Sequence, residues 1–151
     1  MKILCERGFT FVEIAILAVI IVLLAVIAIP NFMKSKWHAN EENAIASLRL
    51  IHTAMESFRA GQRPKLYTNA NSLSVLSTSK PPYIDTMLGN GTKQGYNFRL
   101  NDVSAYGYTA QARPVAFKVT GNRSFVIDET GVLRVRGQSD WLAKAQGEIV
   151  K

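Results

Sequence analysis

The stretch Arg7–Pro30, RGFTFVEIAILAVIIVLLAVIAIP, decides most of what the sequence says about the fold. Phe9 to Ile29 comprises 21 residues whose polar members are Thr10 and Glu13, and its last 16 residues are apolar without interruption. As a helix this segment would be roughly 31 Å long, about the hydrocarbon thickness of a bilayer. The sequence therefore predicts a membrane-spanning helix.

A cleavable signal and a lipid anchor fit this stretch less well than a membrane span. A cleavable secretory signal has an apolar core of about 7 to 15 residues followed by a small-residue cleavage site, and the first 40 residues show neither feature. Lipidation of Cys5 would need a useful length of apolar sequence in front of it, and there is none. We therefore expect the span to stay in the mature protein.

Glu13 is an acid at the edge of this apolar segment. A carboxylate near the end of a membrane helix costs about 2 to 3 kcal/mol on insertion scales, so it usually has a partner or a function. Its role could be structural, because the dipole at a helix N-terminus favours an acid in the first turn. Its role could also be functional, because a charge in apolar surroundings is stabilised by pairing with the opposite charge.

The residues around Glu13 favour the functional role. Arg7-Gly8-Phe9-Thr10-Phe11-Val12-Glu13, followed by the apolar run, resembles the leader and helix start of the type IV pilin superfamily, which includes pilins and the pseudopilins of type II secretion. The resemblance extends over about residues 6–37. It implies leader cleavage between Gly8 and Phe9, N-methylation of Phe9, and an assembly role in which Glu13 pairs with the terminal amine of a neighbouring subunit.

The same resemblance implies partners and a location. The partners are further copies of the chain in a helical homopolymer, a prepilin peptidase and methyltransferase, an inner-membrane assembly platform with its ATPase, and the membrane before assembly. The precursor would cross the bacterial inner membrane once, with its N-terminus in the cytoplasm, before joining a surface pilus or a periplasmic pseudopilus. Charge counting alone gives no orientation, because Lys2 and Arg7 on one side of the span balance Lys34 and Lys36 on the other.

An amphipathic helix is predicted to follow the apolar one. Residues 31–60 contain no proline or glycine, and their apolar residues recur at steps of four and three, which puts them on one helix face. This stripe comprises Ala44, Leu48, Ile51, Met55 and Phe58. Gly61 and Pro64 predict the end of the helix. Pro30 removes one backbone hydrogen bond, so we expect a helix kink or local loosening near residues 26–30.

The remaining residues predict a small sheet. Residues 61–95 are rich in turn-forming residues and are expected to form a surface loop with a short helical turn at residues 73–76. Strands are expected at residues 96–100, 106–112, 124–127 and 132–135. The last two would form a hairpin across residues 128–131. The expected fold class is α+β, a long N-terminal helix whose amphipathic second half covers an antiparallel sheet of three or four strands. Residues 137–151 fit either a short helix or disorder.

Composition excludes several classes of protein. With 151 residues the chain has room for about one ordinary domain. An apolar fraction of 48% is too high for a disordered chain, and the single cysteine excludes an intrachain disulfide and a cysteine-based zinc site. Serine, histidine and aspartate occur without a nucleophile-bearing turn, so we predict no catalytic residues and no enzyme.

Two residue pairs have metal-ligand spacing. His38 and Glu42, and His52 and Glu56, are each four residues apart on the predicted helix. No third ligand accompanies either pair, and such pairs are more typical of surface ion pairs. We predict no metal site from them.

Calcium stays open as an alternative. Asp102, Asp128 and Glu129 could approach one another, as in some major pseudopilins, although their spacing matches no calcium loop. No cofactor is predicted. Asn90-Gly91-Thr92 and Asn122-Arg123-Ser124 have the glycosylation pattern but are more typical of turns.

The prediction for function is a structural, self-assembling subunit. Residues 1–8 would be a prepilin leader, 9–30 the transmembrane and assembly helix, 31–60 the amphipathic helix, and 61–151 a globular head. A type IV pilin is the leading hypothesis, a type II secretion pseudopilin the alternative, and a DNA-binding minor pilin a weaker one. The net charge of +7 is spread along the chain, which is typical of a solvated surface, so nucleic acid is not expected. A plain single-span anchor would show no cleavage after Gly8.

Overall fold

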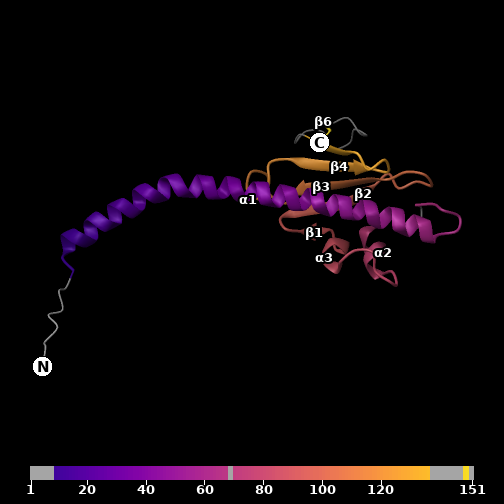
Figure 1. Ribbon diagram of the computed structural model, residues 1–151, viewed down its shortest axis with the longest axis horizontal. Coiled ribbons are helices and arrows are strands. Elements are labelled where there is room, and N and C mark those ends of the chain that lie inside the picture. The colour runs from indigo at the N-terminus through magenta and orange to yellow at the C-terminus, as the bar shows by residue number, and fades with distance from the viewer. Residues whose placement is uncertain (1–8, 68–69, 137–147, 150–151) are drawn as a thin grey trace, which may run out of the picture. The chain divides into compact units, whose positions relative to one another are not determined.

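The computed structural model describes residues 9–67, 70–136 and 148–149, in which nine helices and strands follow one another (Figure 1). They are α1 (Phe11–Gly61), α2 (Leu73–Thr78), α3 (Thr86–Gly89), β1 (Thr92–Lys93), β2 (Tyr96–Asn101), β3 (Thr109–Pro114), β4 (Ser124–Asp128), β5 (Leu133–Arg136) and β6 (Glu148–Ile149). The chain divides after Ser35 into two compact units. The second unit contains the later part of α1 and every other element, and we call it the head.

Helix α1 is 51 residues long and has a clear sequence basis at both ends. It begins at Phe11, directly after Thr10, and it ends at Gly61, where the sequence predicted the end of the helix. Arg59 lies in the last turn, where a cation interacts favourably with the helix dipole. Pro30 lies inside α1, so the kink near residues 26–30 stays a prediction.

The head-forming part of α1 buries the predicted apolar stripe. Ala44, Leu48, Ile51, Met55 and Phe58 are all buried, which confirms the helical period of this segment. Each fully buried side chain of the larger kinds contributes about 1.5 to 3 kcal/mol to folding. The stripe is therefore the main reason why this half of α1 stays on the head.

The sheet is a meander in which each strand pairs with the next in sequence. Its six strands lie in the order β1 to β6, and all pairs are antiparallel. The four predicted strands are the central ones, and β4 and β5 form the predicted hairpin. The prediction of three or four strands missed β1 and β6, which have two residues each and so carry no periodic signal. Strand β3 begins at Thr109 and not at residue 106, because Ser104 and Gly107 form a hydrogen-bonded turn before it.

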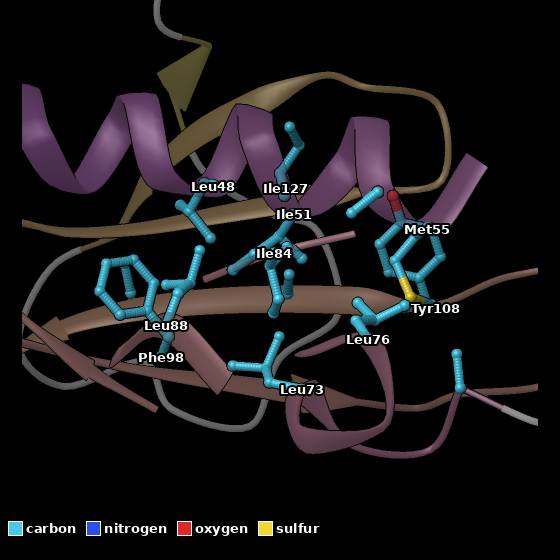
Figure 2. Close-up of a cluster of buried hydrophobic side chains, with 14 of the residues drawn as sticks. Leu48, Ile51, Met55, Leu73, Leu76, Ile84, Leu88, Phe98, Tyr108 and Ile127 are labelled. Atoms are coloured by element: carbon cyan, nitrogen blue, oxygen red, sulfur yellow. The ribbon is translucent and has the colours of Figure 1, made fainter. Parts of the chain in front are cut away.

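The hydrophobic core lies between α1 and one face of the sheet (Figure 2). From the sheet it takes Phe98 of β2, Ala110 and Ala112 of β3, and Phe125 and Ile127 of β4. The expectation that residues 61–95 form a surface loop was wrong in part, because α2, α3 and the turn between them also bury apolar side chains. These are Leu73, Leu76, Ile84 and Leu88. Segments this short show no helical period in sequence, so their burial was not visible there.

Two predicted segments lie wholly or mostly outside the described residues. The leader at residues 1–8, including Cys5 and Gly8, is one of them. Of the tail at residues 137–151, only Glu148–Ile149 is described, and its backbone forms β6 and not a helix.

Candidate functional site

The N-terminal part of α1 exposes its apolar side chains along its whole length. Between Phe11 and Ile29 the large hydrophobic residues are exposed, and the most apolar 18-residue window of the helix has a mean hydropathy of 3.3 with none of it buried. By length and composition α1 can cross a membrane. In water this surface would be costly, so it must be covered by lipid or by other apolar surfaces.

Thr10 and Glu13 form a capping box at the start of α1. The backbone N–H of Glu13 donates a hydrogen bond to Thr10 Oγ1 (3.3 Å), and the backbone N–H of Thr10 donates to Glu13 Oε2 (3.2 Å). The hydroxyl of Thr10 also donates to this oxygen, at 3.2 Å. Such reciprocal bonds satisfy backbone donors that a helix N-terminus otherwise leaves without partners. A threonine three residues before a glutamate is the sequence signal that could have predicted this cap.

The capping box gives Glu13 a structural role within one chain. The structural and the functional role of this acid are compatible, because a carboxylate has lone pairs for a further donor. Phe9 precedes the helix and is exposed, next to Gly8, which lies outside the described residues. Cleavage, methylation and the pairing of Glu13 with an amine stay predictions.

A second polar site lies in the head, where α1 holds the loop between β3 and β4. Glu41 is buried in α1, and its Oε1 accepts the backbone N–H groups of Asn122 (2.9 Å) and Arg123 (3.1 Å). Its Oε2 accepts a hydrogen bond from Nε of Arg123 at 2.8 Å and lies 2.7 Å from Nη2 of the same guanidinium, with which it forms an ion pair. Trp37 Nε1 donates to the carbonyl of Val119 at 3.1 Å, and Asn40 Nδ2 donates to that of Thr120 at 2.8 Å. Three residues of α1 thus fix a loop about 80 positions away.

A third polar cluster lies further along α1. His52 Nδ1 and Tyr108 Oη are 2.7 Å apart, and the rings of Tyr108 and Tyr67 meet edge to face with their centroids 5.0 Å apart. Tyr67 donates its hydroxyl to Glu56, which also pairs with Arg59 at 2.9 Å. Burial, helped by the hydrogen bond to Glu56, raises the pKa of Tyr67 to about 12. His52 and Glu56 are therefore both engaged with protein groups.

Asp128 is engaged in the hairpin between β4 and β5. It accepts the backbone N–H of Thr130 (3.0 Å) and the hydroxyl of the same residue, and it pairs with Arg134. Burial alone would raise the pKa of Asp128, but the hydrogen bonds from Thr130 and Arg134 outweigh it and hold this pKa below its ordinary value. Within the described ranges no three His, Cys, Asp or Glu side chains are placed to hold a metal ion, Asp102, Asp128 and Glu129 included.

The comparisons with known proteins point in one direction. The chain is 30% identical over 95 residues to the type II secretion system core protein G of Escherichia coli (strain K12), covering 63% of this chain and 63% of that protein. It is 32% identical over 95 residues to the core protein G of Pectobacterium carotovorum subsp. carotovorum, covering 63% of this chain and 59% of that protein. It is also 44% identical over 53 residues to the type IV major pilin protein PilA of Myxococcus xanthus (strain DK1622), covering 35% of this chain and 24% of that protein.

These matches are partial. The chain spans less than two thirds of the length of each of these relatives. No protein-family model matches the chain, and no solved structure matches it.

Proposed function

We propose that this chain, whose homologues support placing it in the superfamily of type IV pilins and type II secretion pseudopilins, is a structural subunit that polymerises into a pilus-like filament. The observation that carries the proposal is the exposed apolar surface of α1 from Phe11 to Ile29, which continues as one helix into the buried stripe of the head. A subunit of this design has two ways to cover that surface. Before assembly lipid covers it, and after assembly the same helices of other copies do so.

Assembly of such helices needs more than apolar contact. Lipid tails are as apolar as the helix, so moving it from lipid into a bundle gains little hydrophobic free energy. A charged pair between neighbours would supply an interaction that lipid cannot, and it would also fix the axial register. We propose that cleavage before Phe9 creates the required amine and that Glu13 of a neighbouring copy accepts it. A dedicated peptidase, a methyltransferase, an assembly platform and its ATPase belong to this proposal as partners.

The capping box offers a matched control for the role of Glu13. Thr10→Val removes the hydroxyl of the cap and keeps the carboxylate, whereas Glu13→Gln keeps the length of the side chain and removes its charge. Loss of a cap costs about 0.5 to 2 kcal/mol of helix stability. If charge pairing drives assembly, Glu13→Gln should insert into the membrane normally and form few filaments, and Thr10→Val should assemble. Equal loss of filaments in both variants would show that the cap, and not the charge pair, matters.

Maturation can be read directly by mass spectrometry of the N-terminus in two fractions, sheared extracellular material and the inner membrane. A chain beginning at N-methylated Phe9 in the sheared fraction is the expected result for a pilus subunit. A chain that still begins at Met1 in every fraction would contradict the proposal and leave a plain membrane anchor.

The similarity to core protein G favours one alternative, a pseudopilin in a periplasmic filament. A pseudopilin would undergo the same cleavage and methylation as a pilin and would form the same charge pair. The two differ in location, because a pseudopilin would carry the processed N-terminus and stay in the cell envelope. The same fractionation therefore decides between them.

A further inference from the structure

The loop between β3 and β4, residues 115–123, presents apolar side chains to solvent. Val115 is 55% exposed and Val119 is 58% exposed. The loop is nevertheless well ordered by its own hydrogen bonds. The Ala116 carbonyl accepts the Thr120 N–H at 2.8 Å, and the Lys118 N–H donates to the Gly121 carbonyl at 2.9 Å. Its exposed valines are therefore held outward by a defined backbone.

The loop is held at a particular place along α1. Trp37, Asn40 and Glu41 bind it through the contacts described above. Figure 1 shows this connection between β3 and β4 lying beside α1. Trp37, the first of these three residues, comes four positions after Met33 in the sequence. Met33 is the last exposed large apolar residue before Lys34 and Lys36. The residues that bind the loop therefore follow the apolar segment closely in sequence.

The charge and residue types of this region suit a phospholipid surface. The chain has no acidic residue between Glu13 and Glu41, and it carries Lys34 and Lys36 directly before Trp37. The loop has no acidic residue either, and its Lys118 is exposed. Tryptophan and lysine at the end of an apolar helix are typical of the membrane interface.

The backbone of Lys118 has φ of 60°, a conformation that non-glycine residues adopt at a cost in free energy.

From these observations we infer that the β3–β4 loop is a lipid-contacting surface, in which Val115 and Val119 enter the headgroup region of the bilayer and Lys118 faces anionic phosphates. The loop would seat the head on the membrane while the subunit waits to assemble. This inference rests on the membrane anchoring in the proposed function, but not on filament formation. The attachment of the loop through Glu41, Asn40 and Trp37 makes the contact specific, because the loop cannot move away without breaking these bonds.

The test uses the full chain with Cys5→Ser, reconstituted into vesicles of phosphatidylethanolamine and phosphatidylglycerol. Single cysteines carry a fluorophore at three positions, namely Val119, Tyr106 and Val22, and quenching by doxyl-labelled lipid is measured. Tyr106 is the matched control, since it is 81% exposed but close to Tyr108, which contacts α1 at His52. His52 lies about 16 Å further along the helix than Glu41.

The expected result is strong quenching at Val22, several-fold stronger quenching at Val119 than at Tyr106, and a loss of the Val119 signal with Lys118→Glu at unchanged quenching of Val22. Equal, weak quenching at Val119 and Tyr106 with strong quenching at Val22 would overturn the inference and leave membrane anchoring intact. Weak quenching at Val22 would refute the anchoring itself, and the inference with it. Protection of Val119 that grows with the protein-to-lipid ratio would identify a second copy of the chain as its occupant and would also overturn the inference.

Discussion

Replacing Glu41 by alanine should loosen the β3–β4 loop and destabilise the head. Its side chain is 4% exposed and accepts three hydrogen bonds, two from backbone N–H groups and one from Nε of Arg123, and it forms an ion pair with the same guanidinium. No other described acid is buried to this extent in α1. The carboxylate thus serves as the common acceptor for the end of this loop.

The magnitude follows from which groups lose their partner. A donor left without an acceptor costs about 1 to 3 kcal/mol when it is buried. Asn122 and Arg123 are exposed residues, so water can hydrogen-bond to some of the N–H groups that lose Glu41 as their acceptor. The side chain of Arg123 is 47% exposed, so its charge returns to solvent and the full penalty of a broken buried pair, about 3 to 5 kcal/mol, does not apply. We expect Glu41→Ala to lower the free energy of unfolding by about 3 kcal/mol.

Two further variants calibrate this figure. Glu41→Gln keeps an oxygen for the two backbone N–H groups and loses the charge that pairs with Arg123, so it should cost about 1 to 2 kcal/mol. Glu42→Ala removes the exposed neighbouring acid and should change stability by less than about 0.5 kcal/mol.

Thermal unfolding of the full chain in detergent micelles, followed by near-ultraviolet circular dichroism, measures these differences. At roughly 4 °C per kcal/mol for a head of this size, Tm should fall by about 12 °C for Glu41→Ala. Hydrogen exchange at the amides of Asn122 and Arg123 should rise in the same order as the loss of Tm. A Tm of Glu41→Ala equal to that of Glu42→Ala would refute the reasoning, because it would mean that the loop is held by its other contacts.

Three further predictions concern the head. Gly121→Ala places a Cβ against the hydroxyl of Tyr96 and should lower the free energy of unfolding by about 1 to 3 kcal/mol in thermal melts; Tyr96→Phe in the same chain should recover part of the loss. The lowered pKa of Asp128 means that its contribution is present above about pH 4 and is lost as the pH falls further through the folded-state pKa, so melts at decreasing pH should show a weaker acid dependence for Asp128→Asn than for the native chain. Burial raises the pKa of Tyr67 to about 12, so the stability that this tyrosine contributes is fully present below about pH 10 and is lost as the pH rises towards 12. Burial also raises the pKa values of Tyr96 and Tyr108, so melts of Tyr67→Phe should show a smaller alkaline loss of stability than the native chain, and not its disappearance.

Local sequence patterns predicted the elements whose signal lies within a short window. The buried stripe from Ala44 to Phe58 repeats with the period of a helix, and the strand around Phe98 begins with the alternation typical of a strand. The strand around Phe125 is instead a short apolar run, in which three consecutive residues are buried. Strand β3 was predicted to begin at residue 106, three residues too early. The alternating sequence pattern already starts there, but the hydrogen bond between Gly107 and Ser104 makes these residues a turn. The strands β1 and β6 were missed because two residues cannot show a period.

The candidate site likewise has features that are visible in the local sequence and contacts that exist only in the folded head. The apolar segment was predicted because its signal is local in sequence, and that signal determines which part of α1 exposes an apolar surface. The Thr10–Glu13 cap is equally local, but it was not predicted, and α1 begins at Phe11 and not at residue 9. Glu41 looked like any other surface acid of an amphipathic helix. Its burial and its contacts with Asn122 and Arg123 join positions 81 and 82 residues apart, and they exist only because the sheet packs on α1. Periodicity within one helix decides which face is apolar, but only the folded head decides which polar groups that packing brings together and removes from water.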